Sequence, residues 1–116
     1  MHEVSIANSI IQILNDVVPK DKKGFVSAVN IKVGQLSAIE VDALLFAFDI
    51  VKNKTLLNKA KLNIGIIEGI GECSDCGQSF SMAGYATPCP NCNSYLVKIT
   101  QGKEMKVVSY DFEDEK

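Results

Sequence analysis

A chain of 116 residues can bury one modest hydrophobic core, together with one small subdomain that needs a metal or a crosslink to stay folded. Its 12 basic and 14 acidic side chains give a formal net charge of -2, which argues against a partner made of nucleic acid or anionic membrane. No apolar run approaches the roughly 20 residues that span a bilayer, and the N-terminus lacks the features of a signal peptide, so we expect a cytoplasmic protein.

The first two predicted elements are an amphipathic helix and a half-buried strand. Apolar residues recur at helical spacing from Val4 to Val18, which predicts a helix that ends before Pro19. These residues are Ile6, Ile10, Ile13, Leu14 and Val17. From Phe25 to Val33 the apolar period changes to that of a strand, which Gly34 ends. The residues on its apolar face are Val29, Ile31 and Val33.

A second helix and a second strand follow. Ser37 and Glu40 have the spacing of a capping box, which predicts a helix that begins after Ser37 and continues to about Lys52. Its apolar stripe consists of Val41, Leu44, Leu45, Phe48 and Val51. After a polar connection, three apolar residues alternate with Asn63 and Gly65 and predict the second strand. They are Leu62, Ile64 and Ile66.

All the cysteines of the chain lie in one later stretch as two C-x-x-C pairs, Cys73 with Cys76 and Cys89 with Cys92. Two such pairs joined by a short loop fit tetrahedral thiolate coordination of Zn²⁺. Gly77 allows a turn with positive φ directly after the first pair, and Asn93 can take the same position after the second. We therefore predict a zinc ribbon. The zinc is expected to be structural, because four thiolates leave no open position for a substrate.

Three other uses of paired cysteines compete with zinc. A redox pair of the thioredoxin type would lie where a strand runs into a helix, whereas both pairs here lie in loops rich in Gly, Pro, Asn and Ser. A disulfide framework would need an oxidising compartment. An iron site takes the same four ligands, but the spacer of twelve residues and the few aromatic residues near it favour zinc.

The remaining segments complete the predicted fold. A short apolar strand from Tyr95 to Ile99 closes the cysteine segment, and Met105 to Phe112 forms a last strand that returns to the first sheet. Val107 and Val108 are both apolar, so they leave the inward face of this strand undecided. We predict an α/β fold with a small three-stranded sheet, two helices and an inserted zinc-ribbon subdomain. Residues 1–69 and 101–116 form the α/β domain, and residues 70–100 form the zinc ribbon.

The one histidine of the chain is the second residue, directly after Met1. The α-amine of Met1, the amide nitrogen of His2 and Nδ1 of His2 can form two chelate rings around one ion, in the planar geometry that Ni²⁺ and Cu²⁺ accept. Glu3 or a donor from a partner can take the fourth position. The alternative is an ordinary surface histidine in a loose terminus, and the residues alone leave both interpretations open.

Several segments in this order resemble the HypA/HybF family of NiFe-hydrogenase maturation proteins, which incorporate nickel. They are Met1-His2-Glu3 before an amphipathic helix, residues 33–37 before a helix with Phe46 and Phe48, the two cysteine pairs, and residues 102–105 at the start of the last strand. The resemblance covers essentially the whole chain.

The resemblance implies a nickel metallochaperone and not an enzyme, with Ni(II) as cargo at Met1, His2 and Glu3 in the α/β nickel-binding domain. It also implies structural Zn(II) at Cys73, Cys76, Cys89 and Cys92. The implied partners are a nickel-handling GTPase and the large-subunit precursor of NiFe-hydrogenase, with no nucleic acid and no membrane. The glycines around the ribbon permit a homodimer. The alternative is a zinc-ribbon adaptor that binds nucleic acid or another protein and has no nickel function.

Overall fold

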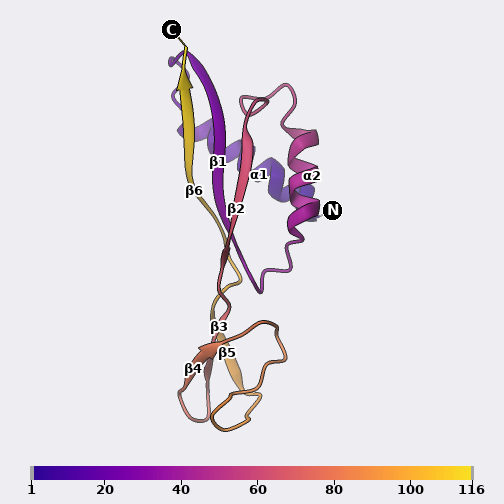
Figure 1. Ribbon diagram of the computed structural model, residues 1–116, viewed down its shortest axis with the longest axis vertical. Coiled ribbons are helices and arrows are strands. Elements are labelled where there is room, and N and C mark those ends of the chain that lie inside the picture. Colours follow the sequence, from indigo (N-terminus) through magenta and orange to yellow (C-terminus); the bar gives the residue numbers. More distant parts are fainter. Residues whose placement is uncertain (1, 116) are drawn as a thin grey trace. The chain divides into compact units, whose positions relative to one another are not determined.

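The computed structural model describes residues 2–115, and within them it contains two helices and six strands (Figure 1). The helices are α1, His2–Val17, and α2, Val41–Val51. The strands are β1 (Gly24–Gly34), β2 (Lys61–Ile67), β3 (Ile70–Cys73), β4 (Ser79–Ser81), β5 (Val97–Gln101) and β6 (Met105–Asp114). Neither helix in this part of the chain is long and apolar enough to cross a membrane.

The strands form two sheets of three, with the orders β2-β1-β6 and β4-β3-β5. The Asn63 side-chain amide donates to Oδ1 of Asn30, and just beyond the end of β1 the Gln35 N–H donates to the carbonyl of Ile67 in β2. The numbers of both partners increase together, so β2 runs parallel to β1, with α2 in the crossover between them (Figure 1). β6 is the last strand and lies on the other side of β1. The predicted fold class is therefore confirmed.

The chain divides into two compact units. Unit 1 combines Met1–Ile31, Ile39–Ile64 and Val107–Lys116, and unit 2 combines Lys32–Ala38 and Gly65–Lys106. Unit 1 contains both helices, and unit 2 contains β3, β4 and β5. The division into a domain of residues 1–69 and 101–116 and a zinc ribbon of residues 70–100 stays a prediction.

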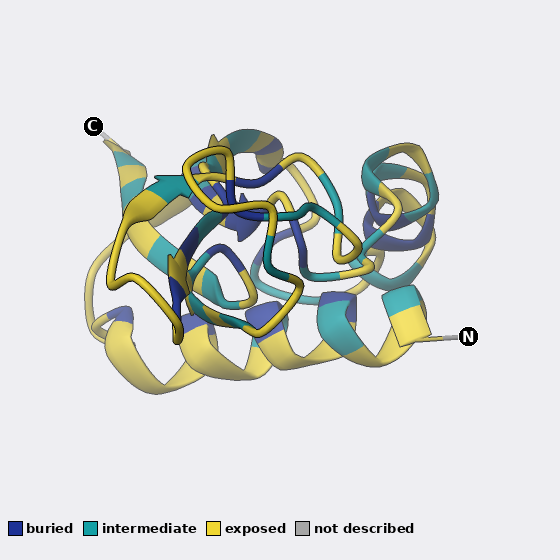
Figure 2. Cartoon of the chain, turned by 90° about the horizontal axis from the view of Figure 1, so that it is seen from below, coloured by how far each residue is buried: buried dark blue, intermediate teal, exposed yellow. Residues whose placement is uncertain are grey.

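The core of unit 1 lies between the helices and the first sheet. Its largest fully buried side chains are Ile10, Leu14, Val26, Val29, Leu44, Phe48 and Leu57. Figure 2 shows α1 with its buried residues on one side and its exposed residues on the other. The buried stripe of α1 is narrower than the apolar stripe of the sequence, since Ile13 and Val17 are both exposed.

The start of α2 differs from the prediction. Glu40, and not Ser37, is the N-cap residue, and its carboxylate accepts a hydrogen bond from the Asp42 N–H at 3.1 Å. Ala38 has a φ of 64°, so the chain turns between Ser37 and the helix. The predicted capping box is therefore wrong, because this left-handed residue separates Ser37 from the first helical turn.

Three strands differ from the predictions in detail. In β2, Leu62 is buried and Ile64 half-buried, but Ile66 is exposed, so the alternation ends at Gly65. The strand that closes the cysteine segment begins at Val97 and not at Tyr95. β4 was not predicted, because three residues of which two are serines give no apolar pattern. In β6, Val107 is half-buried and Val108 is exposed, so Val107 lies on the inward face of the strand and Val108 on the outward face.

Candidate metal centre

The two cysteine pairs adopt the same local turn. After the first pair, the Gly77 N–H donates to the Cys73 carbonyl at 2.8 Å, and after the second, the Asn93 N–H donates to the Cys89 carbonyl at 2.8 Å. Gly77 has a φ of 79° and Asn93 a φ of 62°. Glycine and asparagine tolerate this left-handed conformation better than other residues do. The predicted turn positions are confirmed.

The second sheet positions the first pair, and hydrogen bonds join the two pairs. Cys73 is the last residue of β3, where it pairs with Val97 of β5. The Ser74 N–H donates to the Leu96 carbonyl at 2.8 Å, and the Ser94 hydroxyl donates to the Asp75 carboxylate. These contacts pack the second knuckle against the first.

The structure brings together the sulfur atoms of Cys73, Cys76, Cys89 and Cys92, which all lie within 4.8 Å of one another. The Sγ atoms of Cys73 and Cys92 are 3.6 Å apart, and those of Cys76 and Cys89 are also 3.6 Å apart. A disulfide would require about 2.05 Å. In a tetrahedron with Zn–S bonds of about 2.3 Å, two sulfurs are about 3.8 Å apart, so these residues fit one zinc ion.

Asn91 supports the site from outside the set of ligands. Its Nδ2 donates a hydrogen bond to the Cys76 sulfur at 3.5 Å. This bond is the main reason why the pKa of Cys76 falls from 9.0 to about 6, and the Gln78 amide adds to the effect. A thiolate is the form that binds a metal, so Asn91 favours binding. This role could not be predicted, because nothing in the sequence shows that Asn91 faces the other cysteine pair.

The structure places two of the predicted nickel ligands at the start of α1, and Met1 lies outside the described residues. The His2 side chain is exposed. The Glu3 carboxylate accepts a hydrogen bond from the Glu40 N–H at 3.1 Å, which is the main reason why the pKa of Glu3 lies below its ordinary value of 4.5. Among residues 2–115, only the cysteines form a close group of three or more possible ligands.

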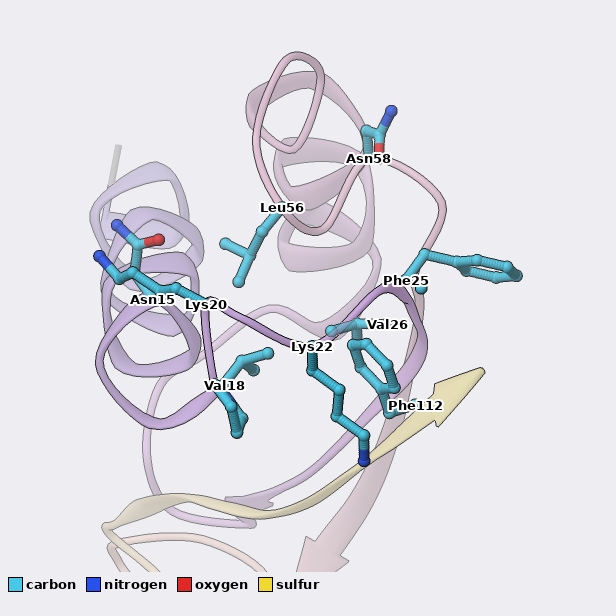
Figure 3. A pocket seen from close by; sticks show the side chains of 11 residues that line it. Asn15, Val18, Lys20, Lys22, Phe25, Val26, Leu56, Asn58 and Phe112 are labelled. Atoms are coloured by element: carbon cyan, nitrogen blue, oxygen red, sulfur yellow. The ribbon is translucent and has the colours of Figure 1, made fainter. Parts of the chain in front are cut away.

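A cavity of about 370 Å³ lies in unit 1, between the end of α1, the start of β1 and the loop after α2 (Figure 3). Two lysines, Lys20 and Lys22, and two asparagines, Asn15 and Asn58, contribute its polar lining. The residues that line it include no histidine, cysteine or carboxylate. We therefore do not assign a metal site to this cavity.

Comparisons with known proteins identify one family to which the chain is similar over nearly its whole length. The HypA family, described as "Hydrogenase/urease nickel incorporation, metallochaperone, hypA", matches residues 1–112. The hydrogenase maturation factor HypA of Parabacteroides distasonis is 41% identical over 109 residues, which cover 94% of this chain and 95% of that protein. The hydrogenase maturation factor HypA of Pelodictyon phaeoclathratiforme is 39% identical over 115 residues, with coverage of 99% and 98%.

Two solved structures are similar over nearly the whole chain. The solution structure of the Ni metallochaperone HypA from Helicobacter pylori has a TM-score of 0.68 and 28% sequence identity, with coverage of 97% and 98%. A second solution structure, of a HypA protein, has a TM-score of 0.71 and 29% identity, with coverage of 99% and 98%. The chain belongs to the HypA family of nickel metallochaperones, which act in hydrogenase maturation.

Proposed function

We propose that this chain carries one Ni²⁺ as cargo at its N-terminus, bound through the α-amine of Met1 and through the amide nitrogen and Nδ1 of His2. The observation that carries the proposal is the place of His2, which is the first residue of α1 and has an exposed side chain. The first amides of a helix have no acceptor within the helix. The fold therefore does not need this N–H for the helix ladder, and the nitrogen can serve as a ligand once it has released its proton to solvent.

Glu3 completes or tunes the nickel site. One of its carboxylate oxygens already accepts a hydrogen bond from the Glu40 N–H. That bond lowers the pKa of Glu3 and holds its side chain at the start of α1. Glu3 accordingly contributes a fixed negative charge beside the cargo, while the amine and His2 supply the strong nitrogen donors.

The second metal is a structural zinc ion held by Cys73, Cys76, Cys89 and Cys92. The distances between their sulfur atoms support this assignment. When bound, zinc ties the two knuckles to each other and thereby stabilises the loop between them. Four sulfur ligands leave no position for a substrate, and transfer of an ion breaks no covalent bond of a substrate, so the protein needs no catalytic group.

The partners in this proposal are a nickel-handling GTPase and the large-subunit precursor of NiFe-hydrogenase, in the cytoplasm. A terminal site with few ligands of its own suits a delivery protein, because a partner that offers better ligands can take the ion. Nickel binds more tightly than most divalent ions but less tightly than copper, so selectivity has to come from geometry and from the docked partner.

The variant His2→Ala tests the cargo site. It should lose tight nickel binding, while its zinc content and its circular dichroism stay those of the parent. Asn8→Ala is a matched control, because Asn8 is an exposed residue of the same helix. Calorimetric titration with nickel measures both variants. If His2→Ala binds nickel as tightly as the parent, the ligand assignment is wrong.

A further inference from the structure

α2 has an apolar outer side in addition to the side that faces the core. Its buried residues are Leu44, Ala47 and Phe48. Phe46 is 70% exposed and Ile50 is 56% exposed. They are one helical turn apart and therefore lie next to each other on the surface. An exposed aromatic residue beside an exposed isoleucine is typical of a surface that another molecule covers.

A groove of about 520 Å³ runs beside these two residues, within unit 1. Its walls include Glu3 and Val4 of α1 and Ala43, Phe46, Ile50 and Val51 of α2. Glu3 is the one charged residue of this lining. The groove is thus apolar along α2, and one of its walls is Glu3, the residue after His2.

The two helices that form the groove carry acidic side chains but no basic lysine or arginine. α1 and α2 together contain Glu3, Asp16, Asp42 and Asp49, and they contain no lysine or arginine, although the chain has 12 basic side chains. Lys52, just after α2, offsets part of this charge, because its ammonium lies 3.2 Å from the Asp49 carboxylate. However, the Lys52 ammonium also donates to the Ala60 carbonyl, and its side chain is only 19% exposed.

We propose that this groove binds an amphipathic, basic helix of a partner protein. The apolar side of that helix would cover Phe46 and Ile50, and its lysine or arginine side chains would face Asp42 and Asp49. Apolar anchors one turn apart in a groove between helices are typical of helix recognition. The inference rests on the proposed function in one respect: Glu3 lines the groove, so a partner seated there lies beside the proposed cargo.

Charge argues against the two other possible occupants. A second copy of this chain, related by a twofold axis, would bring its own Asp42 and Asp49 towards the same residues, and like charges at an interface are unfavourable. A membrane with anionic lipids would be repelled by the same carboxylates. A basic protein segment is the occupant that both the apolar lining and the acidic side chains of the two helices favour.

The test compares Phe46→Ser and Ile50→Ser with Val108→Ser. Val108 is a matched control, since it is as exposed as Ile50 (56%) but lies on β6 and does not line the groove. Each variant is titrated calorimetrically with the purified GTPase and, separately, with the purified large-subunit precursor. We expect the two groove variants to weaken binding of at least one partner about tenfold or more. Val108→Ser should bind as the parent does, and Asp42→Asn should reduce the salt dependence of binding.

Equal binding of Phe46→Ser, Ile50→Ser and Val108→Ser to both partners would overturn the proposal. The proposal would also be overturned if the parent formed a homodimer, or bound vesicles of phosphatidylserine, and Phe46→Ser abolished that association. Nickel content separates this inference from the proposed function, because Phe46→Ser should bind nickel as the parent does. If His2→Ala binds nickel as tightly as the parent, the nickel site lies elsewhere. The comparison of the groove variants with Val108→Ser would still show whether the groove is a docking surface.

Discussion

The carboxylate of Glu3 accepts a hydrogen bond of 3.1 Å from the backbone N–H of Glu40, 37 positions along the chain. Glu40 is also the N-cap residue of α2, so the contact ties the start of α1 to the start of α2. Because this hydrogen bond favours the charged form, the pKa of Glu3 lies below 4.5.

This contact predicts that Glu3→Gln lowers the free energy of unfolding by an amount that depends on pH. A carboxyl group with a lowered pKa contributes stability above the pKa of the unfolded chain, and this contribution is lost as the pH falls through the lower folded pKa. The free energy of unfolding of the parent should therefore exceed that of Glu3→Gln at about pH 6, and the difference should shrink below about pH 4.5. Urea denaturation at several pH values measures it. A difference that does not change with pH would show that the hydrogen bond from Glu40 does not favour the ionised form of Glu3.

Removal of zinc should unfold residues 70–100, while α1, α2 and the sheet of β2, β1 and β6 survive. The reason is that metal binding supplies much of the folding free energy of a small metal-stapled subdomain. Amide hydrogen exchange after treatment with a chelator, and in Cys73→Ser, measures the effect. Loss of protection throughout the chain would show that the two predicted domains are one cooperative unit.

Asn93 should tolerate glycine but not valine. A left-handed φ of 62° suits glycine, whereas a β-branched side chain in this conformation costs about 1–2 kcal/mol. We expect Asn93→Gly to retain the thermal stability of the zinc-loaded parent and Asn93→Val to lower it. Equal midpoints for the two variants in a thermal unfolding experiment would show that the second knuckle does not depend on this turn.

Asn91→Ala should weaken zinc binding, because it removes the hydrogen bond to the Cys76 sulfur. Loss of a partner of a metal ligand typically lowers affinity about 10- to 100-fold. Asn91→Asp keeps the size of the side chain but replaces its N–H donor with a negative oxygen, so it should weaken binding further. Competition with a chromogenic chelator measures both affinities. Parent-like affinity in both variants would exclude this role of Asn91.

The sequence predicts the main elements well where one local pattern determines them. The alternation of Val29, Ile31 and Val33 locates β1, since a strand with one buried face repeats every second residue. The spacing of the cysteine pairs likewise predicts the turns at Gly77 and Asn93, because the turn follows each pair directly.

Features that depend on distant contacts could not be predicted. The role of Glu40 as the N-cap residue depends on the turn at Ala38, and alanine does not mark a left-handed conformation in a sequence. The hydrogen bonds of Glu3 to Glu40 and of Asn91 to Cys76 join residues far apart in the chain. Phe46 and Phe48 look alike as apolar residues of a helix, and only the packing shows that one is exposed and the other buried.

We expect nickel to bind at a free N-terminus followed by His2. The most direct test is a nickel titration of zinc-loaded protein with its native N-terminus, beside the same protein with a few extra residues before Met1, read by calorimetry and by the visible spectrum. We expect only the native form to bind about one Ni²⁺ and to show a square-planar absorption band. Equal binding by both forms, or binding by neither, would contradict this expectation.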